Sequence, residues 1–271
     1  MVGIDREGLG AGLPAFLTSE SLMEKSVHAL DEQASRHMRV LRLDIGARVA
    51  LRDGRGAVAV GQLVRLSKSQ AHVDVQTVAR REPLSPVHML VPVADKERML
   101  WVAEKACELA CTSWRPVIWR RSRSVSPRGE GSSFQQKVAA RMAQALTQSE
   151  GGWLPQLFPE ANVERAMLAA PAGLRVVLDA HGPPLTSVIG DGAGAPGPTG
   201  EAASITLAIG PEGGIEGDEM ALLQQAGFLP ASIGATILRF ETAAIAALAI
   251  ARTVAPVREV QTHYDEGQRR E

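Results

Sequence analysis

A glycine-rich turn after an apolar run is the first feature of this sequence with a clear chemical meaning. Residues 210–214 read GPEGG and follow the apolar, β-branched run at 203–210. Glycine lets the backbone approach a ligand closely, and α/β proteins bind ligands at the carboxyl ends of their parallel strands. No Lys followed by Ser or Thr accompanies the glycines, which excludes a phosphate-binding P-loop. The turn therefore indicates a ligand site, unless its glycines serve only the geometry of the chain.

Two charged residues follow further along the chain. Residues 232–244 predict a short strand, a turn at Gly234, and then Arg239 and Glu241 just before an apolar helix. Beside a helix start, an arginine and a glutamate can act as a cap and a surface ion pair. The same two residues can instead face the glycine turn as a polar cluster. Both interpretations fit the sequence.

The other residues of reactive type form no recognisable site. Cys107 and Cys111 lie four apart on a predicted helix, so they share a face, and the chain has no further cysteine. They predict small buried hydrophobic residues, and neither a zinc site nor a disulfide framework. The six histidines are scattered, without a Ser/His/Asp arrangement. A G-x-G-x-x-G pattern at 192–197 has no strand before it and no helix after it, so we interpret 190–203 as a surface insertion.

Charge is divided unevenly along the chain. The formal net charge is -1, yet residues 1–141 carry a net +7 and residues 142–271 a net -8. Basic residues are densest at 34–81 and at 96–141, with net charges of +7 and +6. Such asymmetry is typical of a protein that holds a polyanion such as nucleic acid on one side. A solvated basic surface is the alternative.

Two patterns of predicted elements divide the chain. Residues 31–42 predict a short amphipathic helix with an acidic start, and 46–80 predict short strands with a hairpin turn at Asp53-Gly54. Strands without helices between them indicate a small β-barrel or sheet. From residue 88 onward strands and helices alternate, which indicates an α/β domain with a parallel sheet. The domain boundary is expected at 82–86.

In the second part, an apolar last helix at 242–252 stands out. Because it is apolar on all sides, we expect it to be buried in a core or against a second subunit. A helix capped by Asp218 should end at Gly227, and the tail from Pro256 is polar and expected to fray. The remaining predicted elements are strands at 87–93, 114–119, 174–180 and 203–210, and helices at 95–110 and 132–148.

Length and composition exclude several classes of protein. The chain has 271 residues and a mass of 28.8 kDa, with 45% hydrophobic and 22% charged residues. That is enough apolar surface for a sizeable core, and it excludes dominant disorder. No apolar run reaches the length of a membrane helix, and residues 1–14 lack a basic start followed by an apolar core. We expect a cytoplasmic protein without a secretory signal.

Two motifs together carry a resemblance to a known family. With IGPEGG at 209–214 and GATILRFETAA at 234–244, the chain resembles the SPOUT superfamily of methyltransferases, and more closely its RsmE family of ribosomal RNA small subunit uridine-N3 methyltransferases. The resemblance covers about residues 30–253. Further similar stretches follow in the same order, at 36–56, 95–109, 121–127 and 143–149.

The chain departs from the family pattern at three places. Ala110 stands where glycine is usual, and the 190–203 insertion is unusual. Thr147 replaces the glutamate of a Glu-Gln pair, and the arginine that usually follows this pair is missing. These departures bear on the substrate contact expected near 147–151 more than on the cofactor site.

The resemblance implies a fold and a cofactor. The fold class is α/β, with a C-terminal SPOUT domain carrying a trefoil knot at 86–255, an N-terminal PUA-like β-barrel for RNA at 1–85, and a tail at 256–271. The cofactor is S-adenosylmethionine, and no metal is expected. The matching motif positions imply cofactor binding by Leu178, Asp179, His181, Ile209, Gly210, Pro211, Glu212, Gly213, Gly214, Ile233, Gly234, Ile237, Leu238 and Thr242.

The implied activity is N3-methylation of a uridine in 16S ribosomal RNA by a homodimer that acts on ribosomal RNA or the small ribosomal subunit. Uridine N3 is nearly non-nucleophilic while it carries its proton. We therefore expect Arg239 to stabilise the anion, and Glu241 to act as a base or to orient Arg239. Two alternatives are a non-catalytic RNA-binding protein with a degenerate knot domain and a SPOUT methyltransferase for another RNA. Expected RNA contacts are Arg36, Arg39, Arg42, Lys96, Lys105, Arg121 and Arg123.

Overall fold

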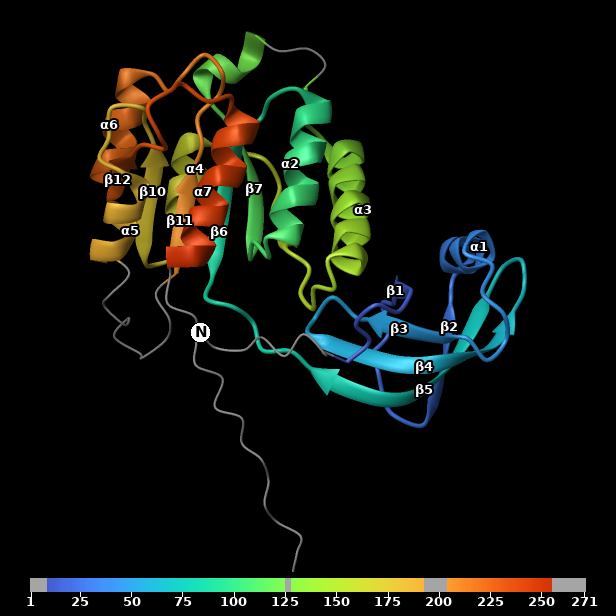
Figure 1. Cartoon of the computed structure of the whole chain (residues 1–271). Coiled ribbons are helices and arrows are strands. Elements are labelled where there is room, and N and C mark those ends of the chain that lie inside the picture. The colour runs from blue at the N-terminus through green and yellow to red at the C-terminus, as the bar shows by residue number, and fades with distance from the viewer. Residues whose placement is uncertain (1–8, 125–127, 193–203, 255–271) are drawn as a thin grey trace, which may run out of the picture.

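The computed structural model describes residues 9–124, 128–192 and 204–254, which form two sheets with their helices (Figure 1). The N-terminal part is a five-stranded sheet in the order β1-β3-β4-β5-β2. The C-terminal part is a seven-stranded sheet in the order β12-β10-β11-β6-β7-β8, with β9 paired to β7. The change from a part made mostly of strands to one in which strands and helices alternate is the one the sequence predicts.

The N-terminal sheet forms because short β-branched runs are separated by turn residues. Gly54 has a φ of +67° at the predicted hairpin turn, and the Asp53 carboxylate accepts hydrogen bonds from the backbone of Arg55 and Ala57. Two short strands before the helix escape prediction, since they lack a clear alternation. The strands are β1 (Ala15–Leu17), β2 (Ser26–Leu30), β3 (Arg48–Arg52), β4 (Ala57–Leu66) and β5 (Ala71–Arg80).

The predicted helix α1 (Glu32–Val40) is confirmed, and its start has the expected cause. The side chain of Asp31 accepts a hydrogen bond from Ala34 N at 2.9 Å, which satisfies one of the free amides of the first turn. Met38 lies fully buried beneath the helix, in the core of the N-terminal sheet.

The C-terminal sheet is parallel throughout its paired strands, as its apolar runs predict. Strand β10 lies between β11 and β12, so the chain segments that leave these three strands meet at one edge. The strands are β6 (Val87–Pro92), β7 (Ser113–Ile118), β8 (Gln156–Leu157), β9 (Ala161–Asn162), β10 (Leu174–Leu178), β11 (Ile205–Ala208) and β12 (Phe228–Ala231).

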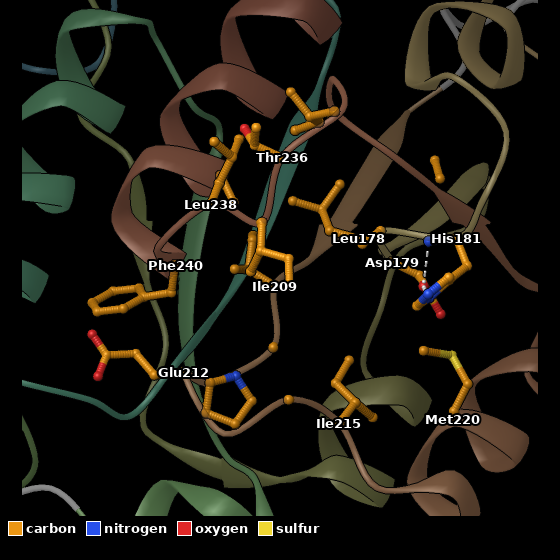
Figure 2. Close-up of a pocket in the computed structure, with 18 residues that line it drawn as sticks. Leu178, Asp179, His181, Ile209, Glu212, Ile215, Met220, Thr236, Leu238 and Phe240 are labelled. Atoms are coloured by element: carbon orange, nitrogen blue, oxygen red, sulfur yellow. Dashed lines mark hydrogen bonds and ion pairs between the residues drawn. The ribbon is translucent and has the colours of Figure 1, made fainter.

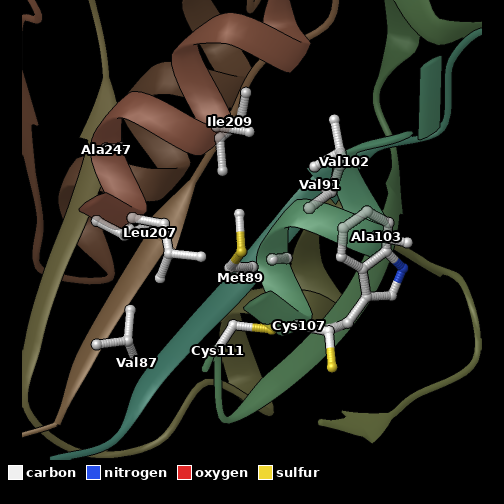
Figure 3. Packing of buried hydrophobic residues seen from close by; sticks show 14 of the residues in the cluster. Val87, Met89, Val91, Val102, Ala103, Cys107, Cys111, Leu207, Ile209 and Ala247 are labelled. Carbon is white, nitrogen blue, oxygen red and sulfur yellow. The ribbon is translucent and has the colours of Figure 1, made fainter. Parts of the chain in front are cut away.

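Helices cover both faces of this sheet. On one face α2 (Lys96–Glu108), α3 (Ser132–Gln148), α5 (Leu185–Gly192) and α7 (Phe240–Val254) share one core. Figure 3 shows Met89 and Leu207 of the sheet in one cluster with Cys107 of α2 and Ala247 of α7. The other face carries α4 (Val163–Leu168) and α6 (Gly217–Gln225), and a 3₁₀ turn spans Arg120–Ser124.

The end of α2 explains one departure from the family pattern. Ala110 has a φ of +54°, and the backbone amides of Ala110 and Cys111 donate to the carbonyls of Cys107 and Ala106 at 2.9 Å. This pair of bonds is the Schellman motif, whose left-handed residue is usually glycine. The guanidinium of Arg252, on α7, donates to the carbonyls of Leu109 and Ala110. Ala110 thus occupies a glycine position at a helix end.

Both cysteines are buried, as predicted. Cys107 lies on α2, but the helix ends before Cys111, so the two do not share a helix face. Burial raises the pKa of the Cys107 thiol to about 12 and also raises that of Cys111. Neither thiol is a nucleophile in the folded chain.

Three predicted boundaries are wrong. Helix α6 is capped by Glu216, in a capping box with Glu219, and Asp218 lies inside its first turn. The strand expected after residue 231 lies before it, as β12, because residues 228–231 pair with β10. The last helix begins at Phe240, two residues earlier than predicted. The expected insertion beyond residue 192 and the tail from 255 lie outside the described residues.

A loop after α3 joins the two parts of the molecule. Arg52 is fully buried, and its Nη1 donates to the carbonyls of Glu150 and Gly151, both at 2.8 Å. Burial, and then the charge of Arg81, lower the pKa of Arg52 to about 10. Backbone bonds from Gly56 and Leu154 cross the same joint. One arginine of the basic N-terminal stretch is therefore a buried structural residue, unavailable to RNA.

Candidate active site

Three loops meet at the carboxyl ends of β10, β11 and β12 and enclose a cavity of about 380 Å³, called here the first cavity. Figure 2 shows Leu178, Ile209 and Leu238, one from each loop, gathered in the same space. The lining is mostly apolar, with Asp179 and Glu212 as its acidic members. A glycine-rich turn at the end of a buried parallel strand thus forms the wall of a cavity, as the sequence predicts.

The glycine turn after β11 needs its glycines for close packing. A Cβ at Gly210 would lie 2.7 Å from Ile215 Cγ1, and Gly214 has a φ of +79°. The amide of Gly214 donates to the carbonyl of Pro211 at 2.8 Å, which closes the turn. A side chain at Gly210 would have to displace Ile215, and one at Gly214 would be strained by the positive φ.

The loop after β10 is held by its own aspartate. Asp179 Oδ1 accepts a hydrogen bond from the backbone of His181 at 2.8 Å, and the Asp179 amide donates to the carbonyl of Ala231 on β12. The His181 ring lies 3.3 Å from Asp179 and is 97% exposed. Gly182 packs against the backbone of Ala231, where a Cβ would come within 2.7 Å of its nitrogen.

Eleven of the predicted cofactor residues line the first cavity: Leu178, Asp179, His181, Ile209, Gly210, Pro211, Glu212, Gly214, Ile233, Ile237 and Leu238. Gly213, Gly234 and Thr242 do not line it. Gly213 packs on the side chain of Arg121, and Gly234 supplies a turn with a φ of +70°. Residues that sequence reasoning missed complete the wall, and all but Thr236 are apolar: Ala180, Ile215, Met220, Ala231, Thr236, Phe240 and Ala243.

A second cavity of about 270 Å³ adjoins the first. The two cavities share Glu212, Ile237 and Leu238 as lining residues. The second cavity adds two guanidinium groups, from Arg98 on α2 and from Arg239. Arg98 lies far from the glycine turn in sequence, and no local pattern marks it.

The charged residues of the second cavity are arranged around Arg98. Its Nη1 donates to Glu212 Oε1, and its Nε lies 3.8 Å from Glu241 Oε1. Glu241 is only 15% exposed, and its other oxygen is buried without a hydrogen-bond partner among the described residues. Glu241 therefore contacts Arg98 and not Arg239. The Arg239 side chain is exposed and makes no hydrogen bond or ion pair within the described ranges.

The predicted RNA-contacting residues differ in how free they are. Arg36, Arg39 and Arg42 lie exposed on and just after α1, with Arg36 paired to Glu32 at 3.2 Å. Lys105 is bound between two glutamates, Glu104 first and then Glu108, which raise its pKa.

Of the remaining basic residues of this group, Arg121 lies near the acidic start of α6. Arg121 is exposed and contacts both Glu216 and the carbonyl of Gly213, while its neighbour Arg120 pairs with Glu216 and Asp218. Lys96 lies 4.0 Å from Glu97. The side chain of Arg123 lies outside the described part.

Two other kinds of site are not found in the part of the chain that the structure describes. There, no three His, Cys, Asp or Glu side chains are grouped closely enough to hold a metal ion. No helix in the same residues has the length and apolar character needed to cross a membrane.

Two family models match the chain. An RNA methyltransferase domain matches residues 80–252, and an RNA methyltransferase PUA domain matches residues 30–76. Fold and site together thus define an RNA methyltransferase with an N-terminal PUA domain.

Curated relatives narrow this class to one family. The chain is 28% identical over 235 residues to the ribosomal RNA small subunit methyltransferase E of Synechocystis sp., which covers 85% of this chain and 74% of that protein. It is 31% identical over 220 residues to the protein of the same name from Mycobacterium bovis, with 77% and 79% covered. The chain belongs to the ribosomal RNA small subunit methyltransferase E family, and the predicted family is confirmed.

A solved structure shares the whole fold. The ribosomal RNA small subunit methyltransferase E of Neisseria gonorrhoeae, bound to S-adenosyl methionine, superposes with a TM-score of 0.79 at 24% identity. The match covers 90% of this chain and 98% of that one. The predicted fold class, a SPOUT α/β domain with a PUA-like N-terminal domain, is confirmed. The trefoil knot of that fold is consistent with the meeting of the three loops.

Proposed function

We propose that this protein uses S-adenosylmethionine to methylate N3 of a uridine in 16S ribosomal RNA. The observation that carries the proposal is the first cavity, whose walls come from the two motifs typical of the family. Its relatives are named for methylation of small-subunit ribosomal RNA, and uridine N3 is the target atom that the family resemblance implies. An action on ribosomal RNA supports our proposal that the protein works in the cytoplasm.

The residues of the first cavity fit this cofactor. Leu178, Ile209 and Leu238 offer an apolar surface to an adenine ring, and the glycine turn exposes backbone for hydrogen bonds to it. Asp179 supplies a carboxylate for hydroxyl or ammonium groups. The volume of about 380 Å³ lies within the usual range for small-molecule sites. The bound cofactor would supply an electrophilic methyl group on a sulfonium.

Arg239 is our proposed anion-stabilising residue. Its free guanidinium lines the cavity next to the cofactor walls, where negative charge develops as the uridine loses its N3 proton. Glu241 acts through Arg98, because Arg98 is the cation that it contacts. Neither Ala110 nor Thr147 falls in a cavity wall. Ala110 closes a helix, and Thr147 donates to the carbonyl of Gln144 on α3.

We further propose that residues 1–85 bind the RNA backbone and that residues 86–255 carry the methyl transfer. The exposed arginines on and just after α1 are the strongest contributors, because Arg39 and Arg42 form no ion pair with a described residue and Arg36 pairs only with Glu32 on its own helix. RNA affinity should fall steeply with added salt, since bound phosphates release counterions. Filter binding with wild type and an Arg36/Arg39/Arg42→Gln variant measures this. An unchanged salt slope in the variant contradicts the assignment.

A homodimer formed through α2 and α7 completes the proposal. Trp101, 46% exposed, lies on α2 between Arg98 and Leu109, both of which contact α7. Ile245 on α7 is also only partly buried. An apolar surface of this kind is typical of an interface between two copies.

Sedimentation tests this interface. Trp101→Glu or Ile245→Asp should produce folded monomers, while Leu168→Asp should leave the dimer intact, because Leu168 is 88% exposed on α4 on the other face. Leu248 is fully buried within one chain, so Leu248→Asp would test folding instead. If Trp101→Glu and Ile245→Asp both remain dimeric, the partner does not bind at α2 and α7.

Two measurements test the activity itself. Calorimetry should show one S-adenosylmethionine site per chain, lost when Gly210 is replaced by Val. Small ribosomal subunits from cells that lack the gene should gain 3-methyluridine when incubated with protein and cofactor. RNA binding without cofactor binding would favour a non-catalytic RNA-binding protein. Methylation of a different RNA would keep the chemistry and change the substrate.

A further inference from the structure

We propose that the second cavity receives the target uracil, and that Arg98 acts there with Arg239 as a pair of guanidinium groups around its imide. This inference rests on the proposed function and assigns the substrate site within it. Enzymes that modify a base extrude it into a fitted pocket. The second cavity adjoins the first through shared walls at Glu212, Ile237 and Leu238. A base held there would face a methyl group held in the first cavity.

The walls of the second cavity match a flat base with polar edges. Ile237 is 92% exposed, and its apolar side chain offers a surface on which the face of the ring can lie. Arg98 and Arg239 come from different elements and supply donors for the polar edge. Glu212 is the carboxylate of the set, and it is 44% exposed.

Two guanidinium groups suit the electronic structure of the reacting base. In uracil, N3 lies between the carbonyl groups O2 and O4, so loss of the N3 proton spreads negative charge over both oxygens. One arginine at each oxygen stabilises this charge and leaves the lone pair of N3 free. Cytosine carries an amino group in place of O4. The amino group and the guanidinium that faces it would both be hydrogen-bond donors, so they could not bond to each other. The pair of arginines therefore selects uracil over cytosine.

The step balances with the residues present. The N3–H bond breaks and its proton passes to the carboxylate of Glu212, which lines both cavities. The lone pair left on N3 forms the new bond to the methyl carbon. The bond between that carbon and sulfur breaks, and its electron pair returns to sulfur, which becomes a neutral thioether. Arg98 releases Glu212 when it turns to the base, so the carboxylate is free to accept the proton.

Glu241 is the positioning residue of this arrangement. Its buried carboxylate lies 3.8 Å from Nε of Arg98, while the Nη1 end of the same guanidinium reaches Glu212. The contact at Nε holds the side chain of Arg98 in place. Its Nη1 end can then exchange its bond to Glu212 for a bond to an oxygen of the base. Arg98 therefore has one permanent partner and one that substrate can replace.

The experiment compares Arg98→Ala, Arg98→Lys and wild type in single-turnover methyl transfer to small ribosomal subunits. Arg165→Ala is the matched control, because Arg165 is an exposed arginine on α4 on the opposite face of the sheet. We expect Arg98→Ala to lower the rate about 100-fold, with cofactor affinity changed less than about threefold, and Arg98→Lys to recover part of the rate. The control should match wild type.

A chemical rescue separates anion stabilisation from a structural role. Subunits assembled on 16S ribosomal RNA containing 5-fluorouridine carry a more acidic N3, since fluorine withdraws electrons, so the anion needs less help from the protein. The deficit of Arg98→Ala should shrink at least about tenfold on this RNA. If Arg98→Ala melts earlier than wild type, Arg98→Lys provides the same comparison, because it keeps a positive charge beside both glutamates.

The outcomes separate the role of Arg98 from the proposed methyltransferase function. A rescued deficit supports the assignment. Full activity of Arg98→Ala, or an equal deficit on uridine and 5-fluorouridine, overturns the role of Arg98 while the methyltransferase function stands. A wild-type protein that transfers no methyl group to ribosomal RNA overturns the proposed function and this inference together.

Discussion

Replacing Arg239 by alanine should damage the reaction while leaving the fold intact. The Arg239 side chain is exposed and has no hydrogen bond or ion pair with the described residues, so its loss leaves no buried group unsatisfied. Its backbone carbonyl, which accepts from Ala243 N at 2.9 Å at the start of α7, is unaffected by the substitution. The free energy of unfolding should therefore change by less than about 0.5 kcal/mol.

The expected loss appears in the rate of methyl transfer. A guanidinium donor that meets the developing charge in the transition state contributes about 2.7 kcal/mol or more, which corresponds to about 100-fold in rate. Arg239→Lys should recover only part, because a point charge lacks the planar fork of a guanidinium. Single-turnover transfer to small ribosomal subunits measures the rate, and calorimetry on the same sample measures cofactor affinity.

Stability and affinity decide how the result is interpreted. A parallel fall in melting temperature, cofactor affinity and rate would refute the reasoning, since it would mean that Arg239 only braces the loop before α7. Arg165→Ala again serves as the control for loss of an exposed arginine.

Three further substitutions or reagents test the fold. Ala110→Gly should raise the free energy of unfolding by about 0.5–1 kcal/mol, because glycine adopts a φ of +54° without strain, and a urea titration measures it. Arg52→Met should lower it by about 1–3 kcal/mol, because the half-buried carbonyl of Gly151 loses its donor while that of Glu150 keeps Nη1 of Arg81, and an unchanged midpoint would contradict this account of the joint. The thiol of Cys107 should not react with a disulfide reagent at pH 8 until the chain unfolds, because burial raises its pKa to about 12. Since that pKa is raised on folding, stability should fall as the pH rises from about 9 toward 12.

Local patterns were sufficient for the elements that carry their own signals. The helix after Asp31, the hairpin at Gly54 and the buried parallel strands follow from capping, turn and burial preferences of nearby residues. Strand β12 was misplaced because its residues are apolar on both sides of Ala231, and only pairing with β10 decides which of them form the strand.

The site was predictable where a motif holds it together and not where distant elements meet. The glycine turn is recognisable from its composition, so most of the residues of the first cavity could be identified. Arg98 could not, because it lies on a helix whose pattern is explained by packing alone, and its pairing with Glu212 spans 114 residues. Glu241 was expected beside Arg239 from proximity in sequence, whereas the start of α7 turns it toward α2.

The joint between the two parts has a thermodynamic consequence for RNA binding. If a flexible linker connected them, docking of RNA on the N-terminal part would leave the C-terminal part free to rotate, and restricting that rotation would cost orientational entropy at the moment of binding. Here the bonds of Arg52 to Glu150 and Gly151 restrict it already in the free chain. That entropy is lost during folding. Each phosphate contact made by the N-terminal part can therefore contribute its full free energy to holding the target nucleotide at the cavities.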